Sequence, residues 1–492
     1  MVYVITVSAV VLLLCGITVY KATQVRNKAD FFVAGRTLSW PVLVFTLLSS
    51  WIGAGSLLAG AENAYKNGFV ALWQPLGGWI GLLLIAMIAG RARHFAQFTV
   101  PDLLEARYNS VARVLATIAI VISYTIITSY QFIGGGDILH LIFPDLPRRT
   151  GLYIMAGFVI FFTAAAGMAS IAYLDLVIGL LVTGTVIVAV PILLHGAGGW
   201  TTVFHSLPRT HFEVLGNYNL AGALGLALPT LLLLIGNQGM YQKFFSAKSE
   251  SDARKSVIGW IVGTVTLETL LVMVAVIASS KLHTDRPREI IPLTAREALP
   301  SLLGAILLGG VFAKVISTAN NYLFSPATNL IHDVYERFID RSATQRRTLI
   351  ASRIIVILLG LFAILQATQF ESILKASLYA YTVYGAAVTP AVMAVFFWRR
   401  TTTAGAITSI LLGTIITVCW ELLQQYGPPN IQAHIGGIDA VYPALIASVF
   451  SLIAVSLSTP PPAPEVLAKF DPRRIALDED RSAPASPARR EA

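Results

Sequence analysis

Long apolar runs separated by short polar segments make up most of this chain. An α-helix needs about 20 predominantly apolar residues to cross a bilayer, and thirteen runs have lengths of that order. The pattern therefore predicts an all-α polytopic membrane protein of about thirteen transmembrane helices. The predicted spans begin near Tyr3, Ser39, Phe69, Ala112, Gly151, Leu174, Leu220, Val257, Leu302, Ile350, Leu374, Ala404 and Val441.

Polar and small residues interrupt the second of these spans. Ser49, Ser50, Gly53, Gly55 and Ser56 stand in its middle, where they support a membrane helix poorly. Two glycines this close permit non-helical backbone, and carbonyl groups freed there are tolerated only beside protein or a water-filled cavity. One interpretation is a broken helix that binds an ion or a solute, as in secondary transporters. The other is a face of small residues on which helices pack closely.

A second interruption lies five spans later, between Pro229 and Lys243, around Gly236-Asn-Gln-Gly239. Interruptions at matching places in two halves of a chain indicate a transporter binding site between inverted repeats. The predicted division is 1–38 for an N-terminal peripheral helix and inner loop, 39–195 and 196–400 for two repeat units, 401–458 for two peripheral helices, and 459–492 for a tail.

Composition and charge agree with a membrane location. The chain is 55% hydrophobic and only 12% charged, against about 25% charged in soluble domains. Its net charge of +9 comes from basic residues in short loops, which is a pattern of membrane topology and not of nucleic-acid binding. With the N-terminus outside, inner loops and tail hold 25 Lys and Arg and outer loops hold 9, leaving Lys314 inside a span. We therefore expect a multi-pass protein of the cell (plasma or inner) membrane with a cytoplasmic C-terminus.

The remaining composition favours transport over catalysis. From Thr459 onward the chain is rich in Pro, Ser, Ala and Arg, which predicts a disordered cytoplasmic tail with no output domain. The eight His show no metal-binding spacing, and no nucleophile elbow or P-loop is present. An embedded enzyme or a sensor is therefore the weaker alternative, and we expect no enzymatic activity.

Five motifs, in order and with their spacing, resemble the sodium:solute symporter family, which includes proline, pantothenate and sodium/glucose carriers. The resemblance covers most of residues 30–405. It implies a 5+5 inverted-repeat core, a small organic solute carried into the cell by alternating access, and Na+ as the coupling ion. The motifs are Asp30-Phe-Phe-Val-Ala-Gly-Arg36, Thr99-Val-Pro-Asp-Leu-Leu-Glu-Ala-Arg-Tyr108, residues 236–249, Ile316-Ser-Thr-Ala-Asn-Asn321, and residues 383–390 leading to Trp398-Arg-Arg400.

The ninth span carries the predicted ion site. Lys314, Ser317, Thr318 and Asn321 follow the i, i+3, i+4, i+7 pattern that places them on one helical face. The resemblance implies that Na+ binds the hydroxyls of Ser317 and Thr318 and a backbone carbonyl one turn earlier, at Lys314. It also implies carbonyl ligands from Ser49 and Ile52 at the first break. The alternative is that the two hydroxyls only bond to carbonyls of their own helix.

Lys314 departs from the family pattern, which has a small residue there. A charge at membrane depth costs at least about 2.5–3.5 kcal/mol, so it needs a partner or a task. In one interpretation the lysine pairs with an acidic residue and sodium binding is intact. In the other its ammonium replaces the cation, and transport is sodium-independent or proton-coupled.

The solute is expected between the two breaks, near Gly53 and Ser56 on one side and Asn237 and Gln238 on the other. Glu268, in the middle of the eighth span, is either a solute contact, a partner of Lys314 or a packing residue. Trp51 replaces a residue that is polar in some family members, so it either walls an apolar solute or packs. Asp175 is either structural or functional. The solute itself is left open among amino acids, monocarboxylates, sugars and vitamins.

Overall fold

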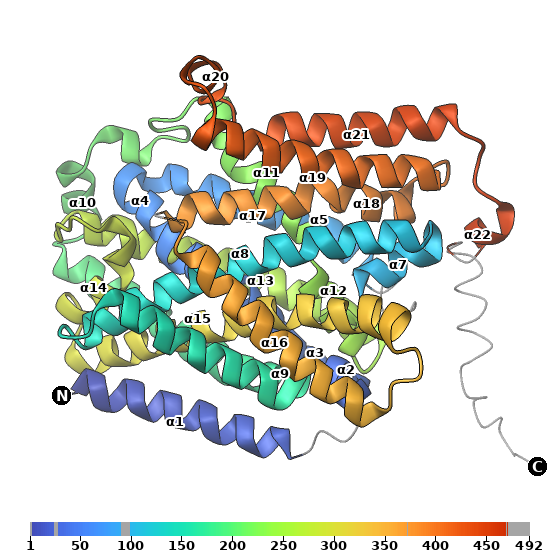
Figure 1. Cartoon of the computed structure of the whole chain (residues 1–492). Coiled ribbons are helices and arrows are strands. Elements are labelled where there is room, and N and C mark those ends of the chain that lie inside the picture. Colours follow the sequence, from blue (N-terminus) through green and yellow to red (C-terminus); the bar gives the residue numbers. More distant parts are fainter. Residues whose placement is uncertain (1, 24–27, 90–98, 371, 469, 471–492) are drawn as a thin grey trace, which may run out of the picture.

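The computed structural model describes residues 2–23, 28–89, 99–370, 372–468 and 470, apart from the side chains of 21, 22, 28–30 and 166–170. Within these residues the regular structure is helical, with one isolated parallel bridge between Leu38 and Ala247. Figure 1 shows the helices side by side, with α1 at one edge of the bundle and α19 with α21 at the opposite edge. The elements are α1 (Val2–Ala22), α2 (Lys28–Val33), η1 (Ala34–Arg36), α3 (Trp40–Trp51), η2 (Gly55–Gly60), α4 (Ala61–Asn67), η3 (Gly68–Leu72), α5 (Trp73–Ala86), α7 (Val100–Arg107), α8 (Ser110–Ile142), α9 (Arg148–Gly196), α10 (Trp200–Ser206), η4 (Arg209–Phe212), α11 (Leu220–Gly236), α12 (Gln238–Ser246), α13 (Glu250–Ser279), η5 (Pro287–Glu289), α14 (Ile290–Glu297), α15 (Ser301–Asn329), η6 (Leu330–Ile339), α16 (Gln345–Ala367), α17 (Ile373–Ala387), α18 (Thr389–Phe397), α19 (Thr403–Tyr426), α20 (Pro429–Ile435), α21 (Val441–Ser458) and α22 (Pro464–Ala468).

The predicted all-α membrane architecture is confirmed, but the count of thirteen spans is not. In the described part of the chain, eleven helices are long and apolar enough to cross a membrane. The two predicted spans outside this number are the second and the fifth. α3 has only 12 residues, because the second predicted span breaks at its end. The fifth and sixth predicted spans both lie within the bounds of α9 (49 residues). Of α9, whose side chains at 166–170 are not described, Ile171–Gly196 is counted. The predicted tail contains α22, which packs against α7, and its residues 469 and 471–492 lie outside the described residues.

Both predicted interruptions are present as breaks in the helices. α3 ends at Trp51, Ile52 has extended backbone (φ −87°, ψ 94°), and a π-helical turn, η2, follows from Gly55. The second break lies between α11 and α12 at Asn237, where the backbone again leaves the helical region (φ −56°, ψ 109°). Non-helical backbone at this depth needs other partners, and the Ala54 N–H finds one in the Gln131 side-chain oxygen at 2.8 Å.

The first break lies in the centre of the bundle. α3 packs against α9, α13 and α15, and α15 itself packs against α8 and α9. α12 contacts both α3 and α15, so the segment after the second break lies beside the segment before the first one. These contacts bring the polar residues of four helices to one buried place.

Candidate ion and solute sites

The break after α3 faces the polar side of α15. The Thr318 hydroxyl donates to the backbone oxygen of Ser49 at 2.9 Å and lies 3.4 Å from that of Ile52. Gly53 lies directly against the Thr318 side chain. Two of the three predicted carbonyls, those of Ser49 and Ile52, and one of the two predicted hydroxyls therefore converge.

The second predicted hydroxyl, that of Ser317, bonds instead to the buried carboxylate of Asp175 on α9. The same carboxylate accepts from Thr46 at 2.5 Å and from the Asn321 amide at 3.5 Å. The Ser49 hydroxyl donates to the backbone oxygen of Asp175 at 3.0 Å. Asp175 thus links α3, α9 and α15 next to the converging carbonyls, and all of its side chain is buried.

Two fully buried lysines lie in this cluster. Lys314 on α15 donates to the Ser49 hydroxyl at 2.9 Å, and not to Glu268. Lys243 on α12 donates to the Asn321 side-chain oxygen at 2.6 Å and to the Ser50 hydroxyl. We refer to Asp175, Lys243, Lys314 and Asn321 as the charged cluster.

Lys243 is a residue that the sequence analysis missed, because it was counted among the basic residues of an inner loop. Every residue of α12 is buried, so the helix after the second break is part of the interior. The signal in the sequence was the run of aromatic residues around it, Tyr241, Phe244 and Phe245, which is unusual for a solvated loop.

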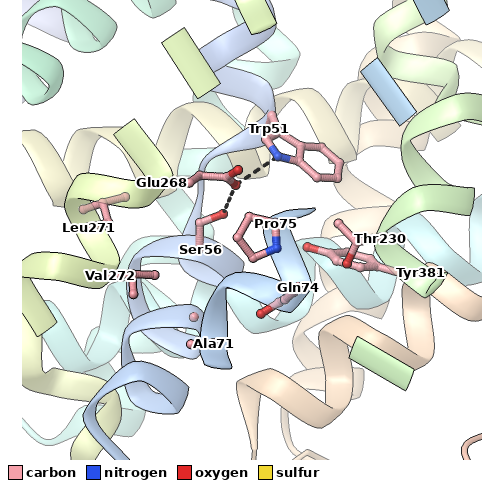
Figure 2. A pocket seen from close by; sticks show the side chains of 11 residues that line it. Trp51, Ser56, Ala71, Gln74, Pro75, Thr230, Glu268, Leu271, Val272 and Tyr381 are labelled. Atoms are coloured by element: carbon pink, nitrogen blue, oxygen red, sulfur yellow. Dashed lines mark hydrogen bonds between the residues drawn. The ribbon is translucent and has the colours of Figure 1, made fainter. Parts of the chain in front are cut away.

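A pocket lies beside the first break. Figure 2 shows Trp51, Ser56 and Glu268 on one side of it and Gln74, Thr230 and Tyr381 on another. The Glu268 carboxylate accepts hydrogen bonds from Trp51 and Ser56, each at 3.1 Å, and from Trp79 at 2.8 Å. The lining residues are Trp51, Ser56, Gly60, Ala71, Gln74, Pro75, Thr230, Glu268, Leu271, Val272 and Tyr381.

Three of the predicted solute residues lie outside this lining. Gly53 contacts Thr318 at the ion site. Asn237 donates to Tyr322 at 3.1 Å and accepts from the Met240 N–H, so it caps α12. The Gln238 side-chain oxygen accepts from the Val100 N–H at 2.5 Å. Trp51, Ser56 and Glu268 are therefore the predicted residues that the pocket brings together, and Gln74, Thr230 and Tyr381 join them without having been predicted.

Ion pairs join α7, α8 and η6 at the end of the bundle that the loop charges predict to be cytoplasmic. Arg113 on α8 pairs with Asp102 and Glu105 of α7 and lies 3.2 Å from Asp333 of η6. Arg337 of η6 pairs with the same Glu105. One buried guanidinium therefore ties α7 and η6 to α8.

We expect Arg113→Gln to loosen this end without loss of the pocket. Removing one member of a buried ion-pair group leaves uncompensated charge and is strongly destabilising locally. Amide hydrogen exchange in α7 should speed up at least about tenfold, which corresponds to about 1.4 kcal/mol. The control is Arg254→Gln, because Arg254 pairs with Glu250 on an exposed surface at 4.0 Å. Unchanged hydrogen exchange in α7 would show that Arg113 does not hold α7 against α8.

The fold and its sites define a class of protein. Membrane helices broken at two places, with freed carbonyls facing hydroxyls at one break and a pocket beside it, are the features of secondary transporters. The comparisons with known proteins identify the class more closely. The model of the sodium:solute symporter family matches residues 31–413, and the chain belongs to this family of sodium-coupled symporters.

Individual relatives agree. The high-affinity proline transporter PutP of Bacillus subtilis (strain 168) is 24% identical over 485 residues, covering 94% of this chain and 98% of that protein. A sodium/proline symporter of Staphylococcus aureus is 23% identical over 481 residues, covering 93% and 92%. Among solved structures, a Na+-coupled sialic acid symporter in a substrate-bound outward-open state has a TM-score of 0.79 at 14% identity, covering 94% of this chain and 98% of that one. The expected family and Na+ as its coupling ion are thus confirmed, and the family and these relatives are transporters.

Proposed function

We propose that Na+ binds between the first break and α15 and drives inward transport of a small organic solute held in the adjacent pocket. The ligands are the backbone oxygens of Ser49, Ile52 and Lys314 and the hydroxyls of Ser317 and Thr318. The observation that carries this proposal is the Thr318 hydroxyl, which lies against both carbonyls of the break. Without the ion, the Thr318 hydroxyl donates to these carbonyls. With an ion among them, its hydrogen turns away and its oxygen becomes a ligand.

The position of the Lys314 ammonium supports the interpretation in which sodium binding is intact. It donates to the side-chain oxygen of Ser49, while the backbone oxygens of Ser49 and Ile52 receive the Thr318 hydroxyl. The lysine therefore contributes to the charged cluster around Asp175 and does not occupy the place between the two carbonyls.

Coupling follows from the position of the ion. An ion shared by α3 and α15 stabilises the conformations in which these helices are together. Ser56 and Trp51, which flank the break, line the pocket, so the same conformations complete the solute site. Each ligand then raises the affinity of the protein for the other by the same factor. The solute leaves the protein chemically unchanged. In the membrane the N-terminus lies outside. Residues 39–195 and 196–400 are the two repeats that move against each other.

Sodium-dependent thermal stability and uptake test this function. Purified protein should be stabilised by NaCl relative to KCl, and proteoliposomes should accumulate solute only with an inward sodium gradient. Proline is the first solute to test, because the relatives transport it.

Thr318→Val should weaken the sodium effect at least about tenfold, since a hydrogen-bonding or ligand contact with a charged group contributes about 1.5–3 kcal/mol. Thr414→Val is the matched control, because among the described residues that hydroxyl bonds to the Ile410 carbonyl of its own helix at 2.8 Å. Equal stabilisation by KCl, or equal uptake without a sodium gradient, would reject the proposal.

A further inference from the structure

The solute pocket contains a carboxylate without a cationic partner. Of the described residues that line it, Glu268 is acidic and none is Lys, Arg or His. The three groups that donate to Glu268 are two indole N–H groups and one hydroxyl, and all three are neutral. The two buried lysines, Lys243 and Lys314, donate their hydrogen bonds to Ser49, Ser50 and Asn321 instead.

A second hydrogen-bond acceptor in the same lining has no donor. Gln74 is 6% exposed, and its side-chain oxygen has no hydrogen-bond partner among the described residues. A buried amide oxygen without a donor costs about 1–3 kcal/mol, so it marks a place where a ligand donor is missing. The pocket therefore offers two acceptors, one of them a carboxylate.

Aromatic faces complete the lining. The rings of Trp51 and Tyr381 stack with centroids 6.3 Å apart and an angle of 27° between their planes. Aromatic side chains offer large, rigid contact area to an apolar group. The rest of the wall is apolar, formed by Ala71, Pro75, Leu271 and Val272.

We propose that the solute is an organic monocation, a protonated primary or secondary amine with a small apolar body. Its ammonium group pairs with Glu268, one N–H donates to Gln74, and the apolar body lies against the aromatic and aliphatic wall. An anionic solute would meet the Glu268 carboxylate with no lining cation to balance it. A quaternary ammonium would satisfy the charge but leave the Gln74 oxygen without a donor. This inference rests on the proposed transport function and names the solute class of its pocket.

A series of four probes at pH 7 and saturating sodium tests the inference. The probes are n-butylamine, butyltrimethylammonium, butanoate and proline, and binding is followed by tryptophan fluorescence, since Trp51 and Trp79 both contact Glu268. Butylamine should bind best, butyltrimethylammonium at least about tenfold more weakly, and butanoate not measurably. Stronger binding of proline or butanoate than of butylamine would overturn the assignment.

Two variants test whether Glu268 and Gln74 bind the ammonium group. Glu268→Gln keeps the side-chain shape and should weaken butylamine at least about tenfold, whereas Glu62→Gln is the matched control, because Glu62 pairs with Lys66 outside the pocket. Gln74→Leu should reduce the preference for butylamine over butyltrimethylammonium, and it tests the site even if Glu268→Gln does not fold. Butylamine affinity equal to wild type in both variants would reject the inference. Stabilisation by sodium without solute is measured separately, so its loss would reject the ion site and leave the solute class standing.

Discussion

Replacing Asp175 with alanine is expected to destabilise the folded protein by about 3–5 kcal/mol and to abolish sodium-driven uptake. The carboxylate accepts from Thr46, Ser317 and Asn321, and each of these groups would lose its buried acceptor. In their ordinary charge states Asp175, Lys243 and Lys314 sum to +1, and the substitution raises this to +2 in a fully buried place. Unfolding in a denaturing detergent, followed by circular dichroism, measures the loss.

A double mutant separates charge from packing. Asp175→Ala together with Lys243→Ala restores the net charge of the cluster, so the combined loss should be smaller than the sum of the single losses by at least about 0.5 kcal/mol. Glu62→Ala is the control, because it removes a carboxylate from a partly exposed i,i+4 pair with Lys66 that contributes about 0.3–0.5 kcal/mol. If Asp175→Ala is no more destabilising than Glu62→Ala, the carboxylate does not hold the cluster together.

Hydrophobic patterning predicted the helices and both breaks, because a membrane forces each spanning segment to be long, apolar and self-satisfied in its backbone bonds. The same pattern could not predict where individual helices begin and end. The fifth and sixth predicted spans fall within the bounds of one helix, α9. The second span is divided, so that α3 has only 12 residues and a π-helical turn follows. Boundaries of this kind depend on tertiary contacts, which a single sequence does not contain.

Site residues that belong to a short sequence motif could be predicted, whereas those that reach the site only through tertiary contacts could not. The i, i+3, i+4 spacing on α15 predicted a polar face that includes Thr318, and the family resemblance implied that its hydroxyl and the Ile52 carbonyl bind the ion; the structure brings these two groups together. Asn237 was predicted to touch the solute, but the freed N–H groups at the start of α12 take its side chain as a cap. Lys243 and Gln74 were missed, because counting loop charges treats a lysine as exposed, and a lone glutamine in an apolar run has no pattern.

Gly53→Ala is expected to lower the affinity for sodium about 10- to 100-fold. A Cβ at this position would lie 2.6 Å from Cγ2 and 2.7 Å from both Cβ and Oγ1 of Thr318, closer than real Cβ contacts allow. Rotation of the side chain does not relieve the contact with the Thr318 Cβ. Thr318 must therefore move away from the backbone oxygens of Ser49 and Ile52, and one ligand contact of about 1.5–3 kcal/mol is lost. Alanine is also a better helix former than glycine by about 0.5–1 kcal/mol, which favours closing the break that frees these carbonyls.

The matched control is Gly184→Ala in α9, because a Cβ there has no neighbouring atom within 4 Å. It adds the same methyl group to a membrane helix and should leave the sodium affinity within about twofold of wild type, a difference of about 0.4 kcal/mol. Sodium affinity is measured by thermal shift against NaCl concentration at constant ionic strength, without solute. If Gly53→Ala binds sodium as tightly as Gly184→Ala, then Thr318 and the two carbonyls at the break do not form the ion site, because the methyl group would have displaced the hydroxyl that joins them.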